Sequence, residues 1–312
     1  MKVLSLFSGI GGLDAGFKKT GFQIVWANDF DKYAVETYRS NYDCPIVLGD
    51  INTIPLDTLP NFDILIGGFP CQPFSMMGSE LGFGDARGTL FFRIAEILKY
   101  KIDAGKKPRA IILENVRTLK THDKGKTFKT IKHILTEELD YTVCDSVLNT
   151  ADYGIPQTRN RTYIVCFAND AAKFVFPEKQ TLTLTLQDLL EYNVDKKYFL
   201  SDTILPTILS DGTGGYKAKS EIDLKIARPL CATMAKMHRA CQDNYVTQNG
   251  RVRRLTPREC ARLQGFDDSF VIPVSDTQAY KQFGNAVTVN VSAAIAKQVR
   301  ITLESLGEWN DE

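Results

Sequence analysis

The sequence has no long apolar run: each hydrophobic stretch among its 312 residues is interrupted well before the length needed to cross a bilayer. The first segment, "MKVLSLFSGIGG", also reaches serine and glycine too early to form the core of a secretory signal peptide. These absences argue against an integral membrane protein. We therefore expect a cytoplasmic protein with no membrane partner.

Histidine is scarce, with 3 residues, and none of the 7 cysteines belongs to a Cys-x-x-Cys pair. The odd number of cysteines argues against a disulfide framework, and the missing Cys-x-x-Cys spacing argues against a zinc site. We expect free thiols in a reducing compartment and no metal cofactor.

Net charge is also low, at +1, so the overall charge gives no indication of a polyanionic partner. The charges are unevenly distributed, because residues 228–262 hold eight Lys or Arg and two acids. A local basic face can bind nucleic acid, but a solvated surface explains the same charges equally well.

Short β-rich runs alternate with amphipathic stretches through the first two-thirds of the chain. The predicted helices cover residues 31–42 and 89–101, and the predicted strands cover 3–7, 22–28, 45–50, 62–68, 109–115, 141–149 and 161–168. This order predicts an α/β fold with a doubly wound, mostly parallel, Rossmann-like sheet.

The alternation stops after Asn169. Residues 175–250 show neither a strand–helix order nor a repeat, which indicates a second, smaller domain. Helical character returns at "RRLTPRECARLQGF", where Thr256 as N-cap, Pro257 and Glu259 form a capping-box pattern. The final apolar segment, 285–303, predicts a long helix.

The stretch "GFPCQPFS" holds Cys71 between Pro70 and Pro73, directly after a predicted strand. A proline disfavours helix for the residue before it, so we expect this thiol on a rigid, non-helical turn. Open α/β sheets bind their ligands at the carboxyl ends of strands. Most free cysteines are simply small buried side chains, so position alone leaves the role of Cys71 open.

The glycine-rich stretch "FSGIGGLDAG" follows the first strand, where a dinucleotide-binding fold has its phosphate turn. Asp14 stands where the third glycine of that fingerprint should fall, so a pyrophosphate cradle is not indicated. Asp29, after the second strand, can bind both hydroxyls of a ribose, and Asp50, after the third, can accept from an adenine amino group. Each acid alone is also consistent with a helix cap or a solvated turn. Together they favour a nucleoside without a pyrophosphate.

The chain resembles the DNA cytosine 5-methyltransferases, which use S-adenosylmethionine. The resemblance covers the whole chain except about 175–250. It rests on eight motifs in the family's order: "FSGIGG", "NDFDKY", "GDI", "GFPCQPFS", "ENV", "QTRNR", "RRLTPRECARLQGF" and "YKQFGNAVTVN". Several are weak singly, but eight in one order are very specific.

The resemblance implies that the Cys71 thiol adds to ring carbon 6 of cytosine, which makes carbon 5 nucleophilic toward a methyl group. It makes Glu114 the acid at ring nitrogen 3, and Arg161, supported by Arg159, the group that positions the carbonyl oxygen of the base. A stacked base is inaccessible, so the cytosine must be flipped out of the duplex. Segment 75–88 resembles the loop that closes over it.

The implied partner is double-stranded DNA, and the implied cofactor is S-adenosyl-L-methionine, with S-adenosyl-L-homocysteine as product. The implied cofactor-binding residues are Phe7, Gly9, Ile10, Gly11, Gly12, Asp29, Phe30, Asp50, Ile51, Pro70, Leu90, Asn285 and Ala286. Many relatives carry Glu and Trp at the positions of Asp29 and Phe30, which puts the cofactor affinity in question. The implied DNA-binding residues are Arg87, Thr158, Lys236, His238, Arg239, Gln242 and Asn244. The implied domains are a catalytic and cofactor-binding domain (1–174), a target-recognition domain (175–250) and a return to the catalytic domain (251–312).

We expect a monomer whose companion is a cognate restriction endonuclease acting on the same site. Three alternatives stay open: a tRNA cytosine-5 methyltransferase, a catalytically silent DNA-binding protein on the same scaffold, and a thiol hydrolase pairing Cys71 with a histidine. The presence of Cys71, Glu114 and Arg161 argues against the silent protein, and the scarcity of histidine argues against the hydrolase. A comparison of methyl transfer to duplex DNA and to tRNA distinguishes the DNA methyltransferase from the first alternative.

Overall fold

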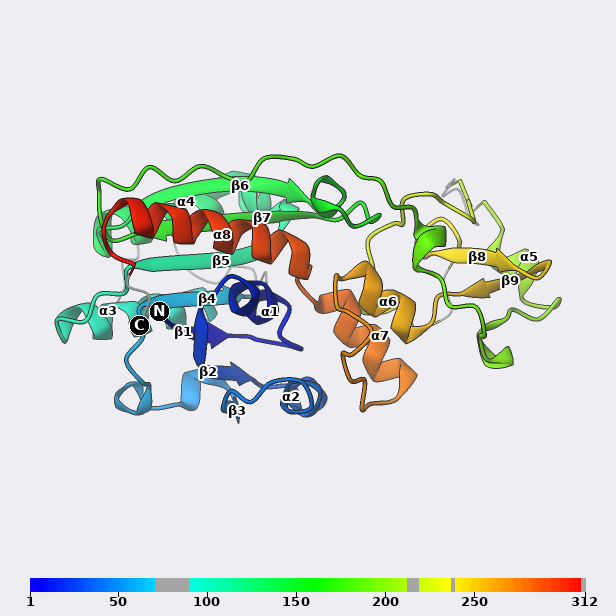
Figure 1. Ribbon diagram of the computed structural model, residues 1–312, viewed down its shortest axis with the longest axis horizontal. Coiled ribbons are helices and arrows are strands. Elements are labelled where there is room, and N and C mark those ends of the chain that lie inside the picture. The colour runs from blue at the N-terminus through cyan, green and yellow to red at the C-terminus, as the bar shows by residue number, and fades with distance from the viewer. Residues whose placement is uncertain (71–89, 212–218, 237–238, 310–312) are drawn as a thin grey trace. The chain divides into compact units, whose positions relative to one another are not determined.

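The chain forms two compact units in the computed structural model, which describes residues 1–70, 90–211, 219–236 and 239–309. Unit 1 comprises Met1–Leu148, Asn160–Glu178 and Val291–Glu312, and unit 2 comprises Asn149–Arg159 and Lys179–Asn290 (Figure 1). Residues 251–290 thus group with unit 2, whereas the division by sequence places 251–312 in the catalytic domain. Which segments carry catalysis and target recognition stays a prediction. Three predicted site residues and the predicted closing loop lie outside the described residues: Cys71, Arg87, His238 and 75–88.

Unit 1 is built on a seven-stranded sheet with the order β3-β2-β1-β4-β5-β7-β6. Neighbouring strands from β3 through β5 run parallel, and β7 is antiparallel to β5. The prediction of a doubly wound, mostly parallel sheet is confirmed. The strands are β1 (Lys2–Leu6), β2 (Gln23–Asp29), β3 (Ile46–Leu48), β4 (Ile64–Gly68), β5 (Ala110–Val116), β6 (Thr142–Asn149) and β7 (Asn160–Phe167).

Helices cover both faces of this sheet. Alternate strand residues such as Leu4, Leu65 and Ile111 form one core with α3 and α4. On the opposite face, toward the viewer in Figure 1, lie α1 and α8, which are joined where Ser292 Oγ donates to the Leu13 carbonyl. The helices of unit 1 are α1 (Gly12–Lys19), α2 (Lys32–Arg39), α3 (Leu90–Asp103), α4 (Lys126–His133) and, from Val291 onward, α8 (Val289–Ser305).

Unit 2 contains an antiparallel hairpin of β8 (Tyr245–Gln248) and β9 (Arg251–Arg254), with α5 (Leu205–Ile208), α6 (Pro257–Leu263) and α7 (Asp276–Asn285). The predicted capping box is confirmed, because Thr256 and Glu259 exchange hydrogen bonds at the start of α6. The long final helix was predicted from residue 285, but it begins at Val289, because Ala286 after α7 is extended. Single turns of 3₁₀ or π helix cover Ile51–Thr53, Leu56–Thr58, Arg117–Lys120, His122–Gly125, Ile134–Glu138, Thr150–Tyr153, Leu186–Leu189 and Lys196–Tyr198.

The described ranges contain neither a candidate membrane span nor a candidate metal site. None of the helices within these ranges combines the length and apolar character needed to cross a membrane. The same ranges hold no group of three His, Cys, Asp or Glu side chains arranged to bind a metal ion.

Candidate active site

The loop between β1 and α1 has an unusual backbone. Phe7, Gly9 and Gly11 all have positive φ angles, of 53°, 56° and 83°. Such a conformation is natural for glycine but strained for phenylalanine, and strain of this kind collects at functional sites. Gly11 is also close-packed, since a Cβ there would lie 2.4 Å from the Tyr42 ring. The Tyr42 hydroxyl donates to the Gly11 carbonyl at 3.1 Å.

Asp29, at the end of β2, holds this loop. One carboxylate oxygen accepts from the Gly9 amide at 2.8 Å, and the other accepts from the Asp31 amide at 2.8 Å. Burial raises the pKa of Asp29 above its usual value, and the backbone hydrogen bonds oppose that shift. The aspartate singled out as a ribose ligand therefore also fixes the glycine loop beside it.

A cavity of about 240 Å³ opens beside the ends of these strands. It is lined by Phe7, Asn28, Phe30, Gly49, Asp50, Ile51, Asn52 and Leu90. Five of these residues were expected at a cofactor site. The other three, Asn28, Gly49 and Asn52, were missed, although each is adjacent in sequence to an aspartate or isoleucine that was predicted.

The lining suits a nucleoside. Phe30 is 73% exposed, an arrangement that leaves its ring face available for stacking. Asp50 caps the turn Ile51–Thr53 by accepting from the Asn52 amide at 3.0 Å, so the helix-cap role considered for it is real. Asn28 donates through Nδ2 to the Val47 and Gly49 carbonyls, both at 2.9 Å, and so fixes one wall.

The remaining predicted cofactor residues have different surroundings. Ile10 is buried and Gly12 begins α1. Pro70 is exposed and follows β4. Asn285 ends α7 and, with Ala286, belongs to unit 2, so their contact with the cofactor stays a prediction.

Glu114 and Arg161 form an ion pair on neighbouring strands, with 3.1 Å between Oε1 and Nε. Their side chains are 10% and 19% exposed. The register explains the pair: Val116 of β5 lies opposite Arg161 of β7, so Glu114 is the diagonal neighbour on the same face. On the other side of β5, Glu114 lies opposite Gly68 of β4 in the strand register, and Gly68 is three residues before Cys71 in the sequence.

Asn115 connects the same two strand ends. Its buried amide donates to the Phe69 carbonyl at 2.8 Å, and its oxygen accepts from the Val116 amide at 2.8 Å. The peptide that leads to Cys71 is thereby attached to β5. The motif "ENV" predicted a role only for its glutamate, and the asparagine was missed although it is the next residue.

Arg159 has different contacts from Arg161. Its guanidinium is buried in unit 2 and donates to the carbonyls of Leu230, Gly284 and Ala286 at 2.8–3.0 Å. It therefore holds together the backbone around predicted cofactor residue Ala286, and its support of Arg161 stays a prediction.

The predicted DNA-binding residues that are described belong to unit 2. Thr158, Lys236 and Gln242 are exposed, and Arg239 is half-buried. Asn244 is buried: it accepts from the Arg228 amide at 2.8 Å and donates to the Arg228 carbonyl at 3.0 Å.

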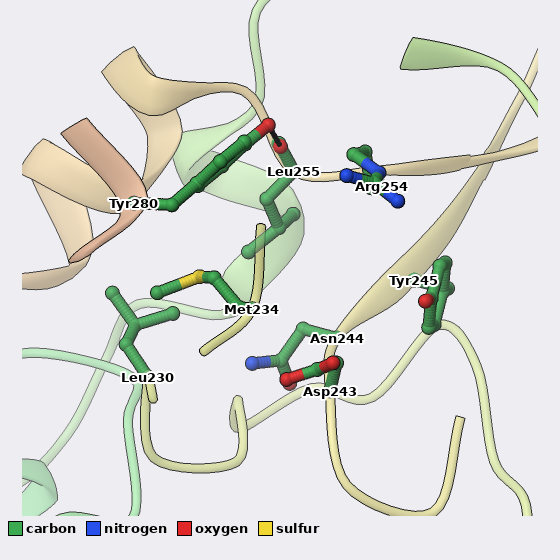
Figure 2. A pocket seen from close by; sticks show the side chains of 8 residues that line it. All are labelled: Leu230, Met234, Asp243, Asn244, Tyr245, Arg254, Leu255 and Tyr280. Atoms are coloured by element: carbon green, nitrogen blue, oxygen red, sulfur yellow. Dashed lines mark hydrogen bonds between the residues drawn. The ribbon is translucent and has the colours of Figure 1, made fainter. Parts of the chain in front are cut away.

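Asn244 also lines the cavity drawn in Figure 2, together with Met234, Arg254 and Tyr280. The Tyr280 hydroxyl donates to the Leu255 carbonyl at 2.6 Å beside it. At about 20 Å³ the cavity has room for a water molecule and not for a nucleobase.

The chain is similar to known methyltransferases over almost its whole length. Over 97% of its length the chain is 43% identical to the Type II methyltransferase M.SsoII of Shigella sonnei, of which it covers 81%. It is 41% identical to the Type II methyltransferase M.NlaX of Neisseria lactamica, with 98% of each chain covered. The solved methyltransferase EhMeth of Entamoeba histolytica shares the fold, with a TM-score of 0.77 at 22% identity over 98% of each chain. Residues 1–300 match the family model for C-5 cytosine-specific DNA methylases. The chain therefore belongs to this family and is a DNA (cytosine-5-)-methyltransferase.

Proposed function

We propose that the enzyme methylates carbon 5 of a flipped-out cytosine in duplex DNA, by way of a covalent adduct with Cys71 and with S-adenosylmethionine as methyl donor. The observation that carries the proposal is the pair Glu114–Arg161 beside the strand end that leads to Cys71. An acid, a fixed guanidinium and a thiol are the three groups that this chemistry requires.

Carbon 5 of cytosine is a poor nucleophile. When the Cys71 thiolate forms a bond to carbon 6, the electrons of the 5,6 double bond become available at carbon 5 for attack on the methyl group. Glu114 protonates or hydrogen-bonds ring nitrogen 3 and so stabilises the charge that the addition places on the ring. Arg161 binds the carbonyl oxygen at carbon 2 and orients the Glu114 carboxylate with its planar donors. A base, for which the family resemblance allows a water molecule, then takes the carbon 5 proton. The electrons of that C–H bond re-form the 5,6 double bond, the bond between carbon 6 and the Cys71 sulfur breaks to release the thiolate, and nitrogen 3 returns its proton to Glu114.

The lining of the cavity in unit 1 supports its assignment as the site of the methyl donor. When bound, S-adenosylmethionine supplies an electrophilic methyl group. Phe7 and Phe30 would flank the adenine, and Asp50 would accept from its amino group. Asp29 would accept from the ribose hydroxyls. Pro70 and Leu90 would contact the methionine portion.

We assign target recognition to residues 175–250, of which 179–250 belong to unit 2. Exposed Lys236 and Gln242 suit phosphate and base-edge contacts. Because the relatives M.SsoII and M.NlaX are named Type II methyltransferases, we propose a cognate endonuclease for this enzyme as well. Replacing 175–250 by the same region of a relative should change the methylated sequence and leave the chemistry intact. A folded, active chimaera that keeps the original sites would place recognition elsewhere.

The adduct is tested by trapping. Bisulfite sequencing of DNA from cells that express the enzyme first identifies the target. Duplex DNA with 5-fluorocytosine at that position should then form a complex that survives denaturing electrophoresis and requires S-adenosylmethionine, since fluorine at carbon 5 leaves no proton to remove. The complex should be lost in Cys71→Ser, because a hydroxyl is a far weaker nucleophile at neutral pH. It should form normally in Cys231→Ser, which changes an exposed cysteine of unit 2. A wild type that methylates its target but is never trapped would contradict the mechanism.

A further inference from the structure

A chain of buried polar side chains runs beneath the glycine loop of unit 1. Asp14 and Ser5 have no exposed surface, Asn28 is 1% exposed and Ser8 is 9% exposed. Buried polar groups destabilise a protein unless they are hydrogen-bonded, and a fully bonded network defines one arrangement of its members.

Asp14, in the first turn of α1, is the start of this chain. Its Oδ1 accepts from the Tyr38 hydroxyl at 2.8 Å, and its Oδ2 accepts from the Ser5 hydroxyl at 2.9 Å. The N-terminal turn of a helix favours a negative charge, which offsets part of the cost of burying the carboxylate. Asp14 thus joins α1, α2 and β1 at one point.

The chain continues through the loop to the cavity wall. The Ser8 hydroxyl donates to Ser5 Oγ at 2.9 Å, and it also lies within reach of the Ser5 and Asn28 carbonyls, at 3.2 and 3.3 Å. Ser8 Oγ accepts from the Asn28 amide at 3.3 Å. The Asn28 side chain donates to the Gly49 carbonyl, and Asn28 and Gly49 both line the cavity of about 240 Å³.

We propose that Asp14 is a positioning residue for the methyl-donor site: through Ser5 and Ser8 it holds the glycine loop and the Asn28 wall in the conformation that binds the donor. The inference rests on the proposed function, since it takes this cavity as the S-adenosylmethionine site. Asp14 itself lies below the loop and is not assigned a contact with the donor.

The test is a double-mutant cycle measured by calorimetry with S-adenosylmethionine and S-adenosylhomocysteine. Ser5→Ala and Ser8→Ala should each weaken binding by about three- to tenfold, the effect of one net hydrogen bond. The double variant should bind no worse than whichever single variant binds more weakly, because both substitutions interrupt the same chain of hydrogen bonds. The matched control is Ser292→Ala, which removes another buried serine that bonds α1; it should lower thermal stability and leave affinity unchanged.

The pH dependence of affinity provides a readout that simple destabilisation would not move. Burial raises the pKa of Asp14 to about 6, against the hydrogen bonds from Tyr38 and Ser5. The ratio of the dissociation constants of Asp14→Asn and wild type should therefore be largest above pH 7 and shrink below pH 6. The facing groups Tyr38 and Cys44 have raised pKa values and stay neutral over this range, and the raised pKa of Asp29 is common to both proteins.

Each result is decisive. Additive effects of Ser5→Ala and Ser8→Ala, an affinity loss in Ser292→Ala equal to theirs, or a ratio independent of pH would overturn the positioning role. Failure of the proposed function is recognised separately, because the wild type itself would then bind neither compound.

Discussion

Asn115 donates a 2.8 Å hydrogen bond from its buried amide to the main-chain carbonyl of Phe69, and this bond ties the end of β5 to the peptide that leads to Cys71. The same strand end carries Glu114. One dipeptide therefore supplies an acid and an anchor for the adjacent loop.

Asn115→Ala should lower the rate of methyl transfer by about tenfold to a hundredfold, because a small displacement of a nucleophile is that costly. The affinity for S-adenosylmethionine should change less than twofold. Single-turnover kinetics and calorimetry check the two parts. Equal losses of rate and of cofactor affinity would show that the residue supports the fold generally and not the loop.

Glu114→Gln should lower the methyl-transfer rate by about 10²- to 10⁴-fold, the usual contribution of a general acid. Arg161→Lys should also be slow, because lysine keeps the charge but lacks the planar donors that pair with the carboxylate. Arg300→Lys, in the exposed pair Arg300–Glu304, is the matched control and should be fully active. A fully active Arg161→Lys enzyme would show that a positive charge is sufficient at this position and that the planar donors are not needed.

The variants Gly9→Ala and Gly11→Ala distinguish backbone strain from steric contact in the glycine loop. Both positions have positive φ, but a Cβ meets the Tyr42 ring only at Gly11 and nothing within 4 Å at Gly9. Gly9→Ala should weaken S-adenosylmethionine binding modestly, and Gly11→Ala should weaken it more. Adding Tyr42→Leu should recover part of the loss in Gly11→Ala and none in Gly9→Ala, as measured by calorimetry.

Arg253 and Glu259 form a bidentate ion pair with no exposed side-chain surface, at 2.6 and 2.8 Å. Glu259→Gln leaves the buried guanidinium without its counter-charge and should lower the free energy of unfolding by about 3–5 kcal/mol. Denaturant unfolding followed by far-ultraviolet circular dichroism measures this free energy. Arg262→Gln, which breaks the more exposed pair Arg262–Asp268, should lower it by about 1 kcal/mol or less.

The free energy of unfolding should depend on pH because the pKa of Asp14 is raised in the folded protein. Its folded pKa, about 6, lies above its ordinary value of 3.8, so the folded state binds the proton more tightly. The stabilisation that this raised pKa contributes is complete below pH 3.8 and is lost as pH rises through 6. The free energy of unfolding of wild type minus that of Asp14→Asn should therefore fall between pH 4 and pH 7. A constant difference across that range would mean that folding does not raise the pKa of Asp14.

Much of the fold could be predicted because its signals are local. Apolar runs of strand length mark β1, β4 and β5, and the order of strands and helices restricts the sheet topology. The capping box at Thr256 is a pattern of four consecutive residues. The long helix was misplaced at its start because the apolar pattern runs through residues 286–288, which separate it from α7 and are not helical.

The sequence by itself determined the family, the chemistry to be expected of Glu114 and Arg161, and the strand ends where a nucleoside would bind. Only the tertiary structure decided which side chains meet. Asp14 and Ser8, 6 residues apart, are joined through Ser5, and Asn115 of β5 reaches Phe69 at the end of the neighbouring strand β4. A motif records the residue types at positions along the chain, whereas such hydrogen bonds depend on strand register and helix packing, which bring distant segments within 3 Å of one another.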